Sequence, residues 1–205
     1  MALITSASVA IISSCKKKDT TPSTPPAPAN VLCDGNGSTS YYPLALNNSW
    51  TFTYYIATQS QSTSPNLVVT GTSSHNSLSY FKIDDQTAVM YGSTVELRQD
   101  AATHNIYYYD SNSGSEFMYV PATPTLNQSW AYTNGGTRKV TNLSSSISTG
   151  SCNYTGLIEI TTYDSGSVLM DKEYFKKGAG MVHREDPDSF FGGFDKYNLS
   201  SITLH

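Results

Sequence analysis

Hydrophobic and polar residues alternate along most of the chain after residue 40. In residues 50–56, aromatic or aliphatic side chains occupy every second position, beginning with Trp50. The same period of two recurs at 95–98, 106–109, 117–119 and 158–160, and then at Val168, Met170 and Tyr174, which are assigned to one apolar face. An amphipathic helix would need a 3.6-residue period over ten or more positions, which these segments lack. The pattern predicts β-strands.

Turn-forming clusters separate these segments. They read DDQ at 84, SNSGS at 111, NGG at 134, DSGS at 164, KKGAG at 176 and FGG at 191. Glycine, asparagine, aspartate and serine favour turns because they adopt left-handed backbone angles or bond to their own backbone. About a dozen short strands at this spacing predict an all-β fold, either an antiparallel β-sandwich or a partly closed β-barrel.

One motif occurs twice. LNNSWTFTY begins at Leu46, and LNQSWAYT begins at Leu126, eighty residues later. In each, a polar turn precedes a strand whose first inward residue is tryptophan. The repeat predicts two related β-meanders, at 41–120 and 121–205, within one all-β body that spans 33–205. The alternative is chance reuse of one turn-and-strand sequence.

The first fourteen residues predict a signal peptide. Residues 2–12, ALITSASVAII, form an apolar run that is too short for a membrane helix of about 20 residues but fits the central region of a secretory signal. The next residues, ISSC at 12–15, resemble a lipobox, which implies diacylglyceryl attachment to Cys15 and cleavage before it. The alternatives are a secretory signal with an incidental cysteine and a buried N-terminal strand.

Residues 15–32 predict a lipidated tether. The sequence KKKDTTPSTPPAPAN after Cys15 holds four prolines and no large apolar side chain. Such a segment cannot join a core, and it favours extended polyproline II structure at about 3.1 Å per residue. Multiple acyl chains on Cys15 would make membrane anchoring stable.

Three stretches resemble a broad set of lipoproteins of the Bacteroidota. They are CKKKD at 15–19, the opening YYPLALNNSW at 41–50 and the closing KGAGMVHRE at 177–185. The resemblance implies a β-rich body and the address of an outer-membrane lipoprotein of the bacterial cell envelope. It implies no activity, so it assigns no functional residues.

Charge excludes one class of partner. The chain has 12 basic and 16 acidic residues; the tether holds three lysines and one aspartate, so the rest carries 9 against 15, or −6. An acidic body without a basic patch repels phosphate backbones, so no nucleic-acid partner is expected. Charged residues make up only 14% of the chain, and tyrosine is abundant, which suits an exported β-protein.

Two cysteines remain after Cys15 is assigned to the lipid. Cys33 and Cys152 form an even pair in an oxidising compartment, which predicts a disulfide between them. The alternative is two buried free thiols. The chain holds no CxxC motif, so redox or zinc chemistry by cysteine is not indicated.

The sequence predicts no catalytic residue, metal site or cofactor. GxSxG and HExxH are absent, and the four histidines stand apart. The densest ionisable cluster is HREDPD at 183–188, where His183 and Glu185 share one side of a strand. It is interpreted as a solvated strand end before a proline turn, although a cation site or proton transfer would use the same residues.

Aromatic side chains indicate a binding surface. Tyr107 and Tyr109 lie on the side of their strand opposite Ile106, and Phe190 and Phe191 lie in a glycine-rich loop. Exposed rings stack on sugars or receive partner proteins, so these four residues are the candidate ligand-binding site for a glycan or an envelope protein. Cross-strand pairing and anchoring of the loop to the core are the alternatives.

Together these features predict a non-catalytic binding or structural module, held to the membrane through the lipid on Cys15. The first alternative is a carbohydrate-active hydrolase or its accessory subunit, which would need two carboxylates about 5–10 Å apart in a cleft with aromatics. The second is a periplasmic carrier of an apolar ligand, which would need a hollow apolar barrel.

Overall fold

The structure is a computed structural model that describes residues 31–56, 59–188 and 192–205. The signal peptide, Cys15 and most of the tether lie outside these residues, as do Phe190 and Phe191. Within them, one helical turn, α1 (Val31–Asp34), precedes the strands. No helix in this part of the chain has the length and apolar character needed to cross a membrane.

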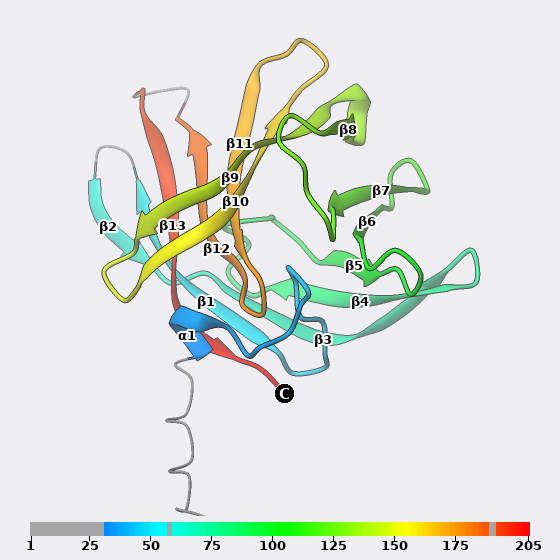
Figure 1. Cartoon of the computed structure of the whole chain (residues 1–205), viewed down its shortest axis with the longest axis horizontal. Coiled ribbons are helices and arrows are strands. Elements are labelled where there is room, and N and C mark those ends of the chain that lie inside the picture. The colour runs from blue at the N-terminus through cyan, green and yellow to red at the C-terminus, as the bar shows by residue number, and fades with distance from the viewer. Residues whose placement is uncertain (1–30, 57–58, 189–191) are drawn as a thin grey trace, which may run out of the picture.

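Thirteen strands form one antiparallel sheet that curls into a nearly closed barrel, so the all-β prediction is confirmed in its barrel form (Figure 1). Twelve of them follow the order β7-β6-β5-β4-β3-β1-β13-β12-β11-β10-β9-β8, and β2 pairs with β1. Their bounds are β1 (Ser49–Ile56), β2 (Gln59–Thr63), β3 (Asn66–His75), β4 (Leu78–Asp85), β5 (Val95–Gln99), β6 (Ile106–Asp110), β7 (Ser115–Val120), β8 (Ser129–Ala131), β9 (Thr137–Ser148), β10 (Asn153–Tyr163), β11 (Leu169–Lys176), β12 (Gly180–Pro187) and β13 (Phe194–Thr203), with a 3-10 turn η1 (Thr133–Gly135) between β8 and β9.

The strand order divides the barrel into two meanders. β1 and β3–β7 follow one another in the first, and β8–β13 follow one another in the second. The meanders join where β1 pairs with β13 along seven residue pairs, from Ser49 opposite Thr203 to Tyr55 opposite Lys196. Each half therefore begins with the strand that carries its tryptophan. A common origin of the two halves stays a prediction.

The two tryptophan motifs have the same local structure. Asn47 and Asn127 both adopt left-handed backbone angles, with φ of 67° and 66°. The Asn47 N–H donates to the carbonyl of Val69, and the Asn127 N–H donates to the carbonyl of Val140, each over 2.9 Å. Trp50 then pairs with Leu67 in β3, and Trp130 pairs with Arg138 in β9.

Trp130 also helps to close the barrel. β7 and β8 stand at opposite ends of the strand order, and Figure 1 shows them on the same side of the molecule. The Trp130 Nε1–H donates to the backbone carbonyl of Met118 in β7 over 2.6 Å. A side chain therefore bridges the two sheet ends.

The core is rich in aromatic side chains and surrounds Trp50. Trp50 is fully buried, its Nε1–H donates to the carbonyl of Ala179 over 2.6 Å, and its ring lies 5.0 Å from that of Tyr42. Gly180 has a φ of +96°, and a Cβ there would lie 3.0 Å from Trp50 Nε1. The glycine thus gives the indole room against the turn between β11 and β12.

The predicted disulfide is present and fixes the start of the body. Cys33 in α1 is bonded to Cys152, which directly precedes β10, with their Cα atoms 5.4 Å apart. The Tyr154 hydroxyl donates to the carbonyl of Leu32 over 2.8 Å. Two links therefore hold α1 against β10.

Candidate functional site

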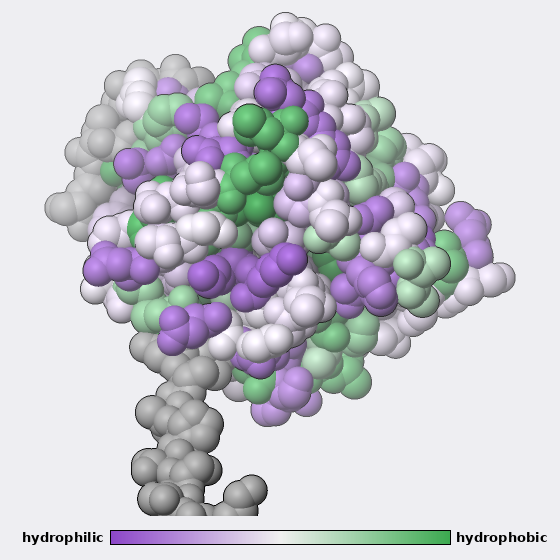
Figure 2. All heavy atoms as spheres, in the orientation of Figure 1, coloured by the Kyte–Doolittle hydropathy of each residue, from purple (hydrophilic) through white to green (hydrophobic). Residues whose placement is uncertain are grey.

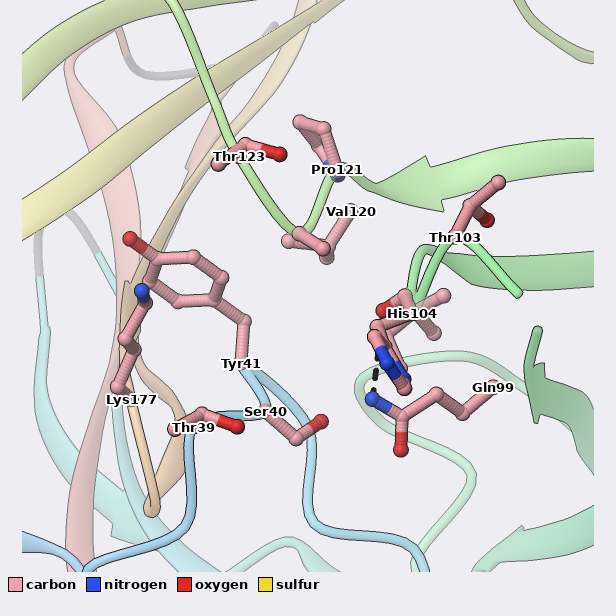
Figure 3. Close-up of a pocket in the computed structure, with 12 residues that line it drawn as sticks. Thr39, Ser40, Tyr41, Gln99, Thr103, His104, Val120, Pro121, Thr123 and Lys177 are labelled. Atoms are coloured by element: carbon pink, nitrogen blue, oxygen red, sulfur yellow. Dashed lines mark hydrogen bonds between the residues drawn. The ribbon is translucent and has the colours of Figure 1, made fainter. Parts of the chain in front are cut away.

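A pocket of about 230 Å³ with both polar and apolar walls lies where four chain segments meet (Figure 3). We call it the Tyr41 pocket. The segments are the stretch before β1, the β5–β6 turn, the stretch after β7 and the β11–β12 turn. Figure 3 shows Tyr41 and Lys177 on one side and His104 and Gln99 on the other. Its polar lining includes Ser40, Gln99, His104, Thr123 and Lys177 around Tyr41.

Backbone hydrogen bonds hold the segment before β1 against the β11–β12 turn. The Asn36 N–H donates to the carbonyl of Gly178 over 2.9 Å, and the Gly178 N–H donates to the carbonyl of Ser40 over 2.8 Å. A Cβ on Gly35 would lie 2.6 Å from the carbonyl oxygen of Lys177, so this approach requires glycine. Tyr41 and Lys177 are thereby positioned side by side, with the Lys177 Nζ 5.1 Å from the centre of the Tyr41 ring.

Asp100 holds the β5–β6 turn, which forms the opposite wall. Its Oδ1 accepts hydrogen bonds from the N–H groups of Ala102 and Thr103 and from the Thr103 hydroxyl. These bonds, together with Arg98, keep the pKa of Asp100 well below its usual range. The Asn105 side chain then accepts from the N–H of Ala122 over 2.8 Å, which ties the stretch after β7 to this turn.

The lining of the Tyr41 pocket combines one ring with many hydrogen-bonding groups. Four hydroxyl-bearing residues, one amide, one imidazole and Lys177 line the pocket together with Tyr41, and four apolar residues complete the wall: Ile106, Val120, Pro121 and Ala122. No aspartate or glutamate belongs to the lining. Burial raises the pKa of the Tyr41 hydroxyl, so the ring stays neutral at physiological pH. The pocket can accept and donate hydrogen bonds and can pack a flat ligand against the tyrosine, but its lining contains no carboxylate pair for acid–base hydrolysis.

A second polar feature lies inside the barrel, where two arginines meet three carboxylates. We call Arg138, Asp171, Glu173, Arg184 and Asp186 the central charge cluster. An Arg138 nitrogen lies 2.5 Å from Oε2 of Glu173, and both side chains are buried. The other Glu173 oxygen accepts from the Tyr119 hydroxyl over 2.8 Å and from Arg184 over 3.5 Å.

The carboxyl groups of the cluster differ in acidity. Burial would raise the pKa of Glu173, but Arg138 and Arg184 outweigh it and hold that pKa below its usual value. Burial raises the pKa of Asp171, and Glu173 adds to the effect. Burial also raises the pKa of Asp186 to about 6, despite a 2.7 Å bond from Arg184.

The cluster bears on both alternative functions. Glu173 is bonded to two arginines, so this carboxylate is not poised as the free acid or nucleophile that a glycoside hydrolase requires. The interior around it is filled by side chains such as Tyr42, Phe175 and Arg138. An apolar ligand would meet buried charges here rather than the hollow apolar barrel that a carrier needs.

The predicted tyrosines lie away from the Tyr41 pocket. Tyr107 packs beneath the guanidinium of Arg98, which lies 4.8 Å from its ring centre. The Tyr109 ring stacks on His75 at 3.8 Å and borders a separate depression of about 380 Å³. Both rings are half-buried in contacts across the sheet, and their role in ligand binding stays a prediction.

The interpretation of 183–188 as a solvated strand end is wrong for its first residues. β12 is covered on both faces, because His183 is buried and Arg184 belongs to the central charge cluster. The His183 Nδ1 lies 2.6 Å from Oδ1 of Asn198, and its Nε2 lies 3.3 Å from Glu185. No group of three or more metal-ligating side chains occurs in the described ranges.

The fold and the pocket define a class: an all-β protein built as one nearly closed antiparallel barrel, with a pocket of mixed polar and apolar lining between its loops. Two solved structures resemble the chain. One, with a YmcC-like fold, is of a protein from Bacteroides fragilis inferred to be exported; it has a TM-score of 0.45 and 10% identity, and the match covers 80% of this chain and 98% of that one.

The other is of a protein from Parabacteroides distasonis inferred to be a lipoprotein. It has a TM-score of 0.36 and 11% identity, and the match covers 81% of this chain and 99% of that one. No protein-family model matches the chain, and no curated protein matches it significantly. Similarity at this level transfers neither an activity nor a cellular address.

Proposed function

We propose that this chain is a non-catalytic, lipid-anchored protein of the bacterial cell envelope that binds a glycan in the Tyr41 pocket. The observation that carries the proposal is the mixed lining of that pocket, where one tyrosine ring and an apolar wall of Ile106, Val120, Pro121 and Ala122 stand beside hydroxyl, amide and imidazole groups. A sugar presents an apolar face to a ring and hydroxyls to polar side chains, so it fits both parts of this lining.

The walls of the pocket are already ordered, which favours binding. Backbone bonds fix Ser40 against Gly178, and the Asp100 turn fixes the opposite wall. A site that is held in place before the ligand arrives loses less conformational entropy on binding. Lys177 has no ion-pair partner in the described part of the chain, so it adds a cation that an acidic sugar would engage.

The rest of the described surface does not favour an apolar partner. Most of the large apolar side chains that are exposed come from separate elements, including Leu46, Leu78 and Leu126, whereas Val168 and Met170 lie together at the β10–β11 hairpin. Figure 2 shows mainly hydrophilic and neutral residues on one face, with a short hydrophobic band near its upper centre and a smaller hydrophobic group at its lower right edge. Large apolar patches mark protein or membrane contacts, whereas a surface of this kind suits a polar ligand.

The proposed envelope address rests on Cys15 and on the disulfide. ISSC at 12–15 resembles a lipobox, and the tether from 15 to 32 would hold the barrel away from the lipid. Disulfides persist in oxidising compartments, which supports export of a chain that joins Cys33 to Cys152. In our proposal the membrane is thus a partner through the lipid alone.

A glycan array tests the binding function, with two variants that separate the rival aromatic sites. The full chain should bind at least one class of immobilised neutral or acidic oligosaccharide. Tyr41→Ala should weaken that binding about tenfold or more, equivalent to about 1.4 kcal/mol, while Tyr109→Ala should leave it unchanged. Equal loss in both variants, loss only in Tyr109→Ala, or release of reducing sugar by the unmodified protein would contradict the proposal.

Metabolic labelling tests the anchor. Cells that express the chain and grow on labelled palmitate should yield labelled protein, and Cys15→Ala should abolish the label because the acceptor thiol is gone. Cys33→Ser serves as the matched control, since it changes one cysteine but leaves the lipobox intact. Label that persists in Cys15→Ala would contradict the lipid attachment without bearing on glycan binding.

A further inference from the structure

A second pocket, of about 300 Å³, lies between η1 and the β10–β11 hairpin. We call it the Asp171 pocket. Its walls are formed by Tyr132, Tyr163 and Met170, and its polar groups include Thr162, Asp164 and Asp171. In Figure 1 the β10–β11 hairpin lies at the end of the molecule opposite α1. The pocket therefore lies at the other end of the molecule from α1 and is separate from the Tyr41 pocket.

Two buried polar atoms at this pocket have no partner other than each other. They are Oδ1 of Asp171 and Oγ1 of Thr162, which face each other across β10 and β11, so that the Thr162 hydroxyl can donate to the Asp171 carboxyl group. Thr162 is buried, with only 5% of its surface exposed. A hydroxyl has one hydrogen to give, whereas an ionised carboxyl group has about four acceptor sites, so Asp171 keeps acceptor capacity on the side of the pocket for a donor from outside the chain.

The charge around Asp171 points to the kind of donor. The central charge cluster holds two guanidinium groups against three carboxyl groups, which leaves one excess negative charge when all are ionised. The nearest cation to Asp171 is Arg184, whose Nη2 lies 3.8 Å from Oδ2. Arg184 is shared with Glu173 and, over 2.7 Å, with Asp186. Asp171 is thus only partly compensated from within the protein.

The pocket itself contains no compensating group. No lysine, arginine or histidine belongs to its lining, and Asp164 adds a second carboxylate at the hairpin. Asp164 Oδ1 accepts the N–H groups of Gly166 and Val168 over 2.8 Å each, so it is held in the turn. A cation that enters the pocket would meet negative charge and aromatic rings, the two features that recognise organic cations.

A metal ion is a poorer match than an organic cation. No cluster of three or more His, Cys, Asp or Glu side chains in the described part of the chain could ligate one. The walls are the carbon-rich side chains of two tyrosines and a methionine, which suit an apolar body attached to a charged head.

We propose that the Asp171 pocket binds the ammonium group of a small amine with an apolar body. The ammonium donates to Oδ1 of Asp171, and to the Thr162 oxygen beside it, and supplies the positive charge that the cluster lacks. The apolar body packs between Tyr163 and Met170. The Arg138 guanidinium lies 5.0 Å from the centre of the Tyr132 ring. Tyr132 lines the pocket and Arg138 does not, so this guanidinium packs against Tyr132 outside the lining.

Calorimetric titration of the full chain with benzylammonium chloride, at neutral pH and low salt, tests this inference. Benzyl alcohol is the matched neutral probe, because it keeps the ring and a hydrogen-bond donor but lacks the charge. Benzylammonium should bind at least about tenfold more tightly than benzyl alcohol. Asp171→Asn should reduce benzylammonium binding by about tenfold or more while leaving the alcohol's binding unchanged.

Asp84→Asn is the matched variant, since it makes the same change of charge on β4, where Asp84 accepts the Thr70 and Thr94 hydroxyls. It should bind benzylammonium as the unmodified chain does. Equal binding of the two probes, equal loss in the two variants, or no binding at about 10 mM benzylammonium would overturn the proposal. If Asp171→Asn fails to fold, the comparison of the two probes on the unmodified chain decides. Neither result depends on glycan binding in the Tyr41 pocket.

Discussion

At the scale of single residues, the carboxylate of Glu173 lies between two guanidinium groups and a tyrosine hydroxyl inside the barrel. Moving an unpaired carboxylate from water to such a place costs several kcal/mol. Arg138 offsets much of that cost, and its guanidinium also lies 4.4 Å from the centre of the Tyr119 ring. Removing one member of the Arg138–Glu173 pair should therefore lower the stability of the protein more than removing both.

Arg138→Met should lower the free energy of unfolding by about 3–5 kcal/mol, because it leaves Glu173 buried beside Arg184 alone. Urea denaturation monitored by fluorescence measures the change. The double variant Arg138→Met with Glu173→Leu should be less destabilised than the single one, since the uncompensated charge is gone. A loss of under about 1 kcal/mol in Arg138→Met would show that the ion pair matters little to stability.

The same cluster explains where residue-level prediction failed. Alternation assigned Val168, Met170 and Tyr174 to one apolar face. Tyr174 is buried, but Val168 and Met170 are exposed, while Glu173 and Phe175 on the other face are buried. A hydropathy pattern predicts that an acidic residue points to solvent. When a strand carries charged residues on its inner face, the pattern therefore predicts the wrong face as buried. Arg138 and Glu173 left no signal in the sequence because each is compensated by a residue from another strand.

At the scale of elements, the tryptophan motifs begin equivalent strands but meet different surroundings. Trp50 pairs with Leu67 and is fully buried, whereas Trp130 pairs with Arg138 and is half-buried at the seam between β8 and β7. Both indoles donate to a backbone carbonyl over 2.6 Å. The motif therefore gives a matched pair of sites for measuring one interaction in two environments.

Trp50→Phe should cost about 3 kcal/mol, because it removes indole volume from the core and leaves the carbonyl of Ala179 buried without its donor. Trp130→Phe should cost about 1 kcal/mol, since the Met118 carbonyl lies at a strand edge. Urea denaturation gives both values, and hydrogen exchange should show faster exchange at β7 and β8 in Trp130→Phe alone. A larger loss of stability in Trp130→Phe than in Trp50→Phe would contradict this account.

The elements were easier to predict from the sequence than the pocket they support. Strand alternation and turn clusters led to the all-β fold, because both depend on neighbouring residues. The Tyr41 pocket joins residues as distant as Ser40, His104 and Lys177, and only the strand order brings them together. Tyr41 was recognised as part of YYPLALNNSW, but nothing in that stretch indicated a pocket.

At the scale of the whole molecule, the disulfide joins the start of the body to its second meander. It closes a loop of 119 residues, which includes the entire first meander. Loop closure of that length restricts the unfolded chain and is worth at most about 5 kcal/mol. The bridge, the β1–β13 pairing and the Trp130 contact are thus three separate links between the two halves.

Replacing both Cys33 and Cys152 with serine should lower the free energy of unfolding by about 2–5 kcal/mol, measured by urea denaturation. The barrel should still form, because Tyr154 keeps its bond to the Leu32 carbonyl and the β1–β13 ladder is untouched, so circular dichroism should be unchanged without denaturant. The unmodified protein in excess dithiothreitol is the control and should match the double variant. If the double variant is as stable as the oxidised protein, loss of the disulfide adds little conformational freedom to the unfolded chain. Strand pairing alone would then set the stability of the barrel.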